Sequence, residues 1–169
     1  NGLKMGDGKL KDSMIIDGLW CAMNDYHMGT TAENISEKYN ISKQDQDEFA
    51  TLSQNKAEEA QKKNKFESEI LNVPVTQKKE TIDFKNDEFP RHGSTLEKIS
   101  SLKPVFKKDG TVTAGNASGL NDGAATVTLM NEETSKKLNI TPIARIISWA
   151  TTGVDPAIMG IGPVPATKK

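Results

Sequence analysis

The segment TVTAGNASGLNDGAA, residues 111–125, carries more information about this chain than any other. It opens on a short β-prone run and continues into a stretch with glycines at positions 115, 119 and 123. Glycine lets a backbone approach a ligand that a side chain would block, and Ser118 can donate and accept a hydrogen bond there. A tight strand-to-helix turn fits the same pattern, so spacing alone leaves both interpretations open. The segment matches neither the P-loop nor the dinucleotide fingerprint.

The sequence before this segment predicts two helices. Thr30 and Glu33 form a capping-box pattern for a helix that stops at Asn40. Ser42 begins a second helix. Its apolar residues recur at helical spacing, so we expect its middle to be buried; they are Phe49, Leu52, Ala57 and Ala60.

Strands are predicted on both sides of the glycine-rich segment. Residues 69–75 read as a strand, and residues 76–110 read mostly as loop. Residues 124–130 and 143–154 are rich in β-formers, with a helix expected between them over residues 132–138. A strand-helix-strand unit usually buries a parallel pair, which places the chain in the α/β class.

Length and composition describe a globular chain without a general affinity for polyanions. The 169 residues fit one domain plus parts of others, and the net charge of −1 offers no field to attract nucleic acid. No apolar run approaches the roughly 20 residues that span a bilayer. The single cysteine, Cys21, cannot form an internal disulfide, so a reducing aqueous compartment fits best. Both ends of the sequence look cut, and residues 163–169 read as the first turn of a helix with Pro165 at an early position.

Two histidines and one cysteine give little sign of a metal or nucleophile site. His27 precedes the first predicted helix, and a lone histidine is more often a structural hydrogen-bonding group than a catalyst. His27, His92 and Cys21 have no familiar metal-ligand spacing, so no metal is expected. Cys21 lies in an apolar run, where we expect a raised pKa and little reactivity.

Residues 91–108 contain a basic cluster in the predicted loop. Arg91 and His92 are followed by lysines at positions 98, 103, 107 and 108. Such a cluster suits a phosphate or a phosphorylated cofactor, while a solvated surface is the alternative for most of these lysines.

Taken together and in order, these stretches resemble the thiolase family. The matching segments are YHMGTTAEN (26–34), QDEFATLSQNKAEEAQ (46–61), DEFPRHGST (87–95), KDGTVTAGNASGLNDGAA (108–125) and ARIISWATTGVDPAIMGIGP (144–163). The resemblance covers nearly the whole chain. The sequence HMG at 27–29 resembles the short-chain, acetoacetyl-type members, since long-chain relatives usually carry another residue in place of His27.

The resemblance implies a five-layered α/β/α/β/α thiolase fold made of two related halves. By analogy, residues 1–120 would be the loop domain that covers coenzyme A, inserted in the first half. Residues 121–141 would end the N-terminal half, and residues 142–169 would begin the C-terminal half. Residues 1–14, which also read as a hairpin-like excursion, resemble the hairpin that joins dimers of short-chain thiolases into a homotetramer.

The implied activity is that of an acetyl-CoA C-acetyltransferase: the reversible Claisen condensation of two acetyl-CoA to acetoacetyl-CoA and coenzyme A. The implied partners are these thioesters and coenzyme A, with no other cofactor, no nucleic acid and no membrane, in the cytoplasm. The implied contacts with coenzyme A and the acyl group come from nine residues: Leu19, His27, Met28, Arg91, Phe106, Ala114, Ser118, Leu120 and Met159. Arg91 would meet the adenosine diphosphate end, and His27 and Ser118 the pantetheine arm. Lys98 and Val105 depart from residues that some relatives carry.

The family's two catalytic cysteines have no counterpart in these residues, because Cys21 aligns with neither. We therefore expect the 169-residue chain alone to lack thiolase activity. Two alternatives stay open: a 3-ketoacyl-CoA thiolase of broader chain length, and a non-catalytic module that binds coenzyme A or assembles with other subunits.

Overall fold

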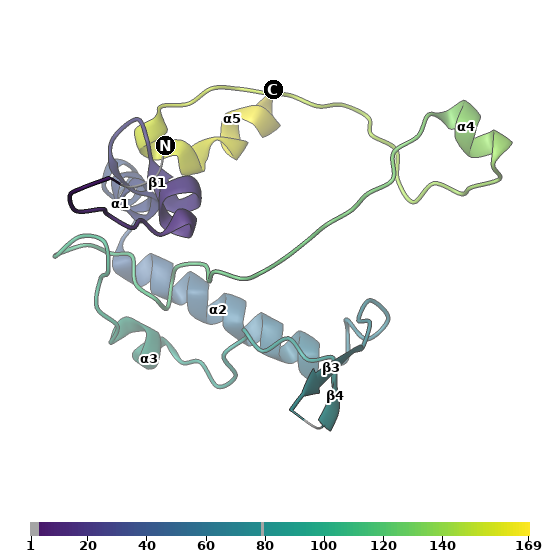
Figure 1. Ribbon diagram of the computed structural model, residues 1–169, viewed down its shortest axis with the longest axis horizontal. Helices are drawn as coiled ribbons and strands as arrows, with labels where there is room; N and C mark the ends of the chain where they lie inside the picture. Colours follow the sequence, from purple (N-terminus) through teal and green to yellow (C-terminus); the bar gives the residue numbers. More distant parts are fainter. Residues whose placement is uncertain (1–3, 79) are drawn as a thin grey trace.

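Two helices joined by a short turn, α1 and α2, follow the N-terminal segment in the computed structural model, which describes residues 4–78 and 80–169 (Figure 1). Helix α1 spans Met28–Tyr39 and ends where Asn40 adopts a left-handed conformation, with φ of 53°. Helix α2 spans Lys43–Lys62, and Ser42 and Asp45 form a reciprocal capping box at its start. The predicted end of α1 and start of α2 are confirmed. The predicted start of α1 is wrong, because the helix begins two residues before Thr30 with His27 as its N-cap.

A π-helix and a small antiparallel ladder precede α1. The π-helix η1 spans Met14–Leu19, and strands β1 (Trp20–Cys21) and β2 (Tyr26–His27) pair with Trp20 opposite His27. Residues 4–12 form no paired strands, so the hairpin expected within residues 1–14 is wrong for that part; residues 1–3 lie outside the described chain.

The predicted long loop contains a second hairpin and a short helix. Strand β3 (Val73–Gln77) pairs antiparallel with β4 (Glu80–Phe84), and helix α3 spans Leu96–Ser100. The strand predicted over 69–75 therefore starts later, and β4 and α3 were missed. Both missed elements have five residues, too few for a hydrophobic period to stand out.

Two extended arms lead out to helix α4, which spans Glu132–Lys137, and back (Figure 1). The prediction of α4 is confirmed, but residues 124–130 and 143–154 form no strands. Their apolar side chains are exposed, with Ile143 at 105% and Trp149 at 87%. A β-strand needs a neighbour for its backbone N–H and C=O groups, and the described residues place none beside these arms.

The last elements return to helix α1. The 3₁₀ helix η2 (Pro156–Ile161) packs on α1, where Asn34 Nδ2 donates to Ala157 O at 2.9 Å. A Cβ at Gly160 would lie 2.9 Å from Ile35 Cδ1, so a larger residue there would have to displace the end of the Ile35 side chain. Helix α5 (Pro163–Lys168) follows and confirms the helical turn predicted there.

The interior of the described chain is small and partly polar. Phe49 is 74% exposed and Leu52 is also exposed, so the prediction that the middle of α2 is buried through these side chains is wrong. The buried residue of α2 is instead Asp47, which is 1% exposed. Among residues 4–78 and 80–169, no helix combines the length and apolar character needed to cross a membrane.

Candidate functional site

His27 is fixed at the first turn of α1 by its own ring. Its Nδ1 accepts a hydrogen bond from Gly29 N at 2.9 Å, which satisfies one of the free N–H groups at the helix start. Because Nδ1 accepts, the hydrogen of the neutral ring lies on Nε2. The ring is therefore oriented, with Nε2 available to donate to a ligand.

Phe106 stacks on this imidazole. The two ring centroids lie 4.7 Å apart with an interplanar angle of 23°. A Cβ at Gly29 would overlap the Phe106 ring, so the glycine in the HMG sequence admits the phenyl ring against the helix. Residues that are 79 positions apart in the sequence thus form one aromatic surface.

The glycine-rich segment is anchored to α1 by a buried carboxylate. Glu33 is 4% exposed, and its two oxygens accept hydrogen bonds from Thr111 N at 3.0 and 2.8 Å and from Val112 N at 2.9 Å. The hydroxyl of Thr111 lies 3.0 Å from Glu33 Oε2. A Cβ at Gly110 would collide with the same carboxylate. The sequence had suggested that Glu33 caps the start of the helix. In the structure its carboxylate instead binds the glycine-rich segment.

A second buried carboxylate anchors the segment to α2. Asp47 accepts from Asn116 Nδ2 at 2.9 Å and from Lys43 Nζ at 2.5 Å. Asn116 Oδ1 in turn accepts from Thr113 N at 2.7 Å. Residues 111–116 are thus held at both ends, and no buried side-chain nitrogen or oxygen in the described chain lacks a hydrogen-bond partner.

The loop that carries Arg91 is fastened along α2. Gln54 Oε1 accepts from Arg91 N at 2.8 Å, and Glu58 Oε2 accepts from Gly93 N at 2.7 Å. His92 Nε2 lies 2.5 Å from Gln61 Oε1. Gln54, Glu58 and Gln61 share one helix face, so α2 fixes the loop backbone and leaves the Arg91 side chain exposed.

Arg91 and Ala114 line one small hollow of about 300 Å³. Ile99 and Leu102 form its apolar side, and a Cβ at Gly115 would lie 2.6 Å from Leu102 Cδ1. A Cβ at Gly119 would likewise overlap the ring of Phe89. Gly115 and Gly119 therefore let side chains of this chain pack against the segment, whereas no atom lies within 4 Å of the Cβ position at Gly123.

The remaining predicted contacts are spread over η1, α1, η2 and the glycine-rich segment. Leu19 is half-buried at the end of η1, next to Trp20, which pairs with His27. Met28 follows His27, and Met159 lies on η2 against α1. Ser118 and Leu120 are exposed at the end of the glycine-rich segment.

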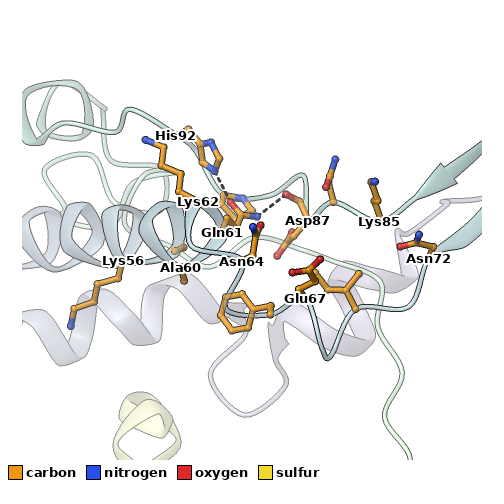
Figure 2. Close-up of a pocket in the computed structure, with 15 residues that line it drawn as sticks. Lys56, Ala60, Gln61, Lys62, Asn64, Glu67, Asn72, Lys85, Asp87 and His92 are labelled. Atoms are coloured by element: carbon orange, nitrogen blue, oxygen red, sulfur yellow. Dashed lines mark hydrogen bonds between the residues drawn. The ribbon is translucent and has the colours of Figure 1, made fainter.

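A larger hollow of about 1240 Å³ opens at the C-terminal end of α2, where His92 meets Gln61 and Asp87 O accepts from Gln61 Nε2 at 3.3 Å (Figure 2). Its wall mixes cationic and acidic side chains, including Lys85 and Glu67. None of the nine predicted contact residues lines it.

Cys21 is buried but differs from the expected inert thiol. Asn24 Nδ2 lies 3.4 Å from its Sγ, and this hydrogen bond lowers the pKa of the thiol, outweighing the opposing effect of burial. The predicted rise in the pKa of Cys21 is therefore wrong. Within the described residues, no group of three His, Cys, Asp or Glu side chains could hold a metal ion.

Comparison with known proteins identifies the family of this chain. The model of the thiolase N-terminal domain matches residues 1–133. The chain belongs to the thiolase family. It is 58% identical over 168 residues to an acetyl-CoA acetyltransferase of Paracoccus denitrificans and 57% identical over 170 residues to one of Cupriavidus necator. In each case the match covers at least 99% of this chain but only 43% of the relative.

Solved thiolase structures share the fold. The crystal structure of the Bacillus anthracis acetyl-CoA acetyltransferase matches 99% of this chain and 42% of its own, with a TM-score of 0.89 at 42% identity. Human mitochondrial 3-ketoacyl-CoA thiolase matches with a TM-score of 0.84 at 41% identity. The predicted family and fold class are confirmed, and the chain spans about 43% of the length of the relatives that it matches.

Sequence reasoning missed the residues that hold this site together. Glu33, Asp47 and Asn116 lie in quoted motifs, yet none was named as functional. A signal was present, because Glu33 and Asp47 lie next to the apolar residues of their helices. A carboxylate buried there requires hydrogen-bond partners. The partners are over 60 residues away, which no local pattern specifies.

Proposed function

We propose that the full-length protein is an acetyl-CoA acetyltransferase that condenses two acetyl-CoA molecules to acetoacetyl-CoA and coenzyme A, reversibly. The 169 residues contribute much of the surface that binds the coenzyme A thioesters. The names of the relatives at 51–58% identity support this reaction. Cys21 is buried and is not one of the nine proposed contact residues. We therefore assign the catalytic cysteines of the reaction to residues outside this chain.

One observation carries the proposal: residues 104–120 run from the His27–Phe106 stack to the hollow at Arg91. An uncharged pantetheine arm needs an apolar groove with few polar anchors, whereas the nucleotide end needs cations. The segment offers both environments in that order, with its middle fixed by Glu33 and Asp47.

Each proposed contact has a defined task. The Nε2–H of His27 donates to the arm, and Ser118 provides a second polar anchor. Arg91 binds the phosphates of the nucleotide. The remaining six residues supply apolar walls for the tunnel or the acyl pocket: Leu19, Met28, Phe106, Ala114, Leu120 and Met159.

The proposed domain division remains residues 1–120 as the loop domain, 121–141 as the end of the N-terminal half and 142–169 as the start of the C-terminal half. The two exposed arms support it, because their apolar side chains suit strands of a sheet completed by other residues of the protein.

A homotetramer in the cytoplasm is also proposed. A mouse relative at 51% identity is named a cytosolic acetyl-CoA acetyltransferase, and sedimentation of the full-length protein measures subunit number.

Steady-state kinetics of the full-length enzyme test the proposal. Arg91→Ala should raise KM for every coenzyme A substrate by roughly tenfold to a hundredfold, because charge-assisted hydrogen bonds contribute about 1.5 to 3 kcal/mol. His27→Ala should lower acetoacetyl-CoA turnover by on the order of a hundredfold, since misplacing the reacting carbon of the substrate by about 1 Å has that effect. Unchanged constants in both variants contradict the site.

A chain-length series decides between the alternatives. Turnover confined to acetoacetyl-CoA supports the short-chain assignment, and equal turnover of longer 3-ketoacyl-CoA substrates favours the broader thiolase. Binding of coenzyme A without any turnover by the full-length protein identifies a non-catalytic module.

A further inference from the structure

The 3₁₀ helix η2, which carries Met159, is tied to α1 by one side-chain amide. Asn34 Nδ2 donates to Ala157 O at 2.9 Å and to the hydroxyl oxygen of Tyr26 at 3.2 Å. A carbonyl oxygen only accepts, so the nitrogen of this amide must face η2, and its two hydrogens allow both bonds. Asn34 therefore connects strand β2, helix α1 and η2, and it does so across 123 positions of sequence.

The residues on both sides of Met159 are packed closely. Ile158 is 6% exposed, and its non-helical φ of −130° and ψ of 37° place a kink in η2 directly before Met159. On the other side, a Cβ at Gly160 would lie 2.9 Å from Ile35 Cδ1 on α1. The side chain of Met159 itself is 49% exposed. The packing of η2 thus fixes the backbone at Met159 and leaves its side chain open to a ligand.

The face of α1 that meets η2 also carries Met28. Met28 and Ile35 are seven residues apart in the same helix, so they lie on one face of it. Met28 and Met159 are the proposed walls of the acyl pocket, and the way η2 rests on α1 sets the room between them. Apolar contact is not directional, whereas a hydrogen bond requires a narrow range of distance and angle. The bond from Asn34 to Ala157 O therefore defines this arrangement more sharply than the packing does.

We propose that Asn34 is a positioning residue for chain-length specificity. Its bond to Ala157 O holds η2 on α1, so that the acyl pocket accepts a short acyl chain and excludes longer ones. One additional methylene in an apolar pocket changes specificity by roughly tenfold to two-hundredfold, so a small outward shift of η2 becomes measurable as altered preference. This inference rests on the proposed function and adds a residue that sets the substrate range without touching the substrate.

Two substitutions of nearly unchanged shape separate the two bonds of Asn34. Asn34→Asp replaces the nitrogen by an oxygen, which accepts from the Tyr26 hydroxyl but cannot donate to Ala157 O. Tyr26→Phe removes the other bond and leaves the one to Ala157 O in place. Asn34→Ser is the second test variant, because it shortens the side chain and removes both bonds without adding a charge.

Thiolysis kinetics of the full-length protein with acetoacetyl-CoA and with 3-ketohexanoyl-CoA test the inference through the ratio of the two kcat/KM values. The wild type should favour acetoacetyl-CoA. Asn34→Asp and Asn34→Ser should shift the ratio towards the longer substrate by about twofold to tenfold, the factor that one hydrogen bond contributes. Tyr26→Phe should keep the wild-type ratio. A merely structural role for Asn34 would lower both values equally and leave the ratio unchanged.

The outcomes separate this inference from the proposed function. An unchanged ratio in the Asn34 variants, an equal shift in Tyr26→Phe, or equal use of both substrates by the wild type overturns the inference while the thiolase activity stands. If Asn34→Asp does not fold, the ratio in Asn34→Ser decides. Failure of the wild type to turn over either substrate overturns the proposed function and the inference together.

Discussion

Replacing Glu33 should release the glycine-rich segment from α1. The carboxylate accepts two backbone N–H groups, those of Thr111 and Val112, and is 4% exposed. Glu33→Leu keeps the volume and leaves both donors without a partner in the interior. Each unsatisfied buried donor costs about 1 to 3 kcal/mol, so the local free energy of opening should fall by about 2 to 6 kcal/mol.

Amide hydrogen exchange in the full-length protein measures this loss. Since about 1.4 kcal/mol corresponds to tenfold, the Thr111 and Val112 amides should exchange roughly thirtyfold to twenty-thousandfold faster in Glu33→Leu. Glu33→Gln keeps one acceptor oxygen and should show a smaller acceleration. The control is Glu37→Gln, one turn along α1, whose side chain is 73% exposed and pairs with Lys107. Exposed pairs contribute about 0 to 1 kcal/mol, so exchange should change little there.

Glu33→Leu also tests whether the buried carboxylate supports the proposed coenzyme A site. Phe106 belongs to the segment that Glu33 holds, since Val105 N donates to Val112 O at 3.0 Å. Glu33→Leu should therefore raise KM for coenzyme A substrates, whereas Glu37→Gln should leave it unchanged. Wild-type exchange at Thr111 and Val112 in Glu33→Leu would refute the anchoring argument.

Two further substitutions test local geometry. Asn24→Ala removes the hydrogen bond that lowers the pKa of Cys21, so the pH midpoint of thiol alkylation should rise; a midpoint that stays or falls contradicts the assigned cause. Gly29→Ala should displace Phe106 from the His27 stack and raise KM for coenzyme A substrates, although alanine is the better helix former by about 1 kcal/mol. Gly18→Ala is its control, because nothing lies within 4 Å of the position of its Cβ, and equal constants for the two variants count against a role for the stack.

Local signals in the sequence were enough for part of the fold. Asn40 and Ser42 mark the end of α1 and the start of α2, because a left-handed C-cap and a side-chain N-cap depend on a few neighbouring residues. Helix α4 was also predicted, from the helical pattern of residues 132–138 between two stretches of β-formers. The order of the motifs also identified the family, since that information lies in residue identities along the chain.

The sequence by itself thus determined the end of α1, the start of α2 and the thiolase family. Only the tertiary structure decided that Glu33 and Asp47 are buried anchors, because their partners lie 78 and 69 residues away and a buried carboxylate is stable only where those donors meet it. It also decided that residues 124–130 and 143–154, though rich in β-formers, form no ladder among the described residues. Side-chain preference favours an extended backbone, but a strand exists only when another backbone lies beside it to share its hydrogen bonds.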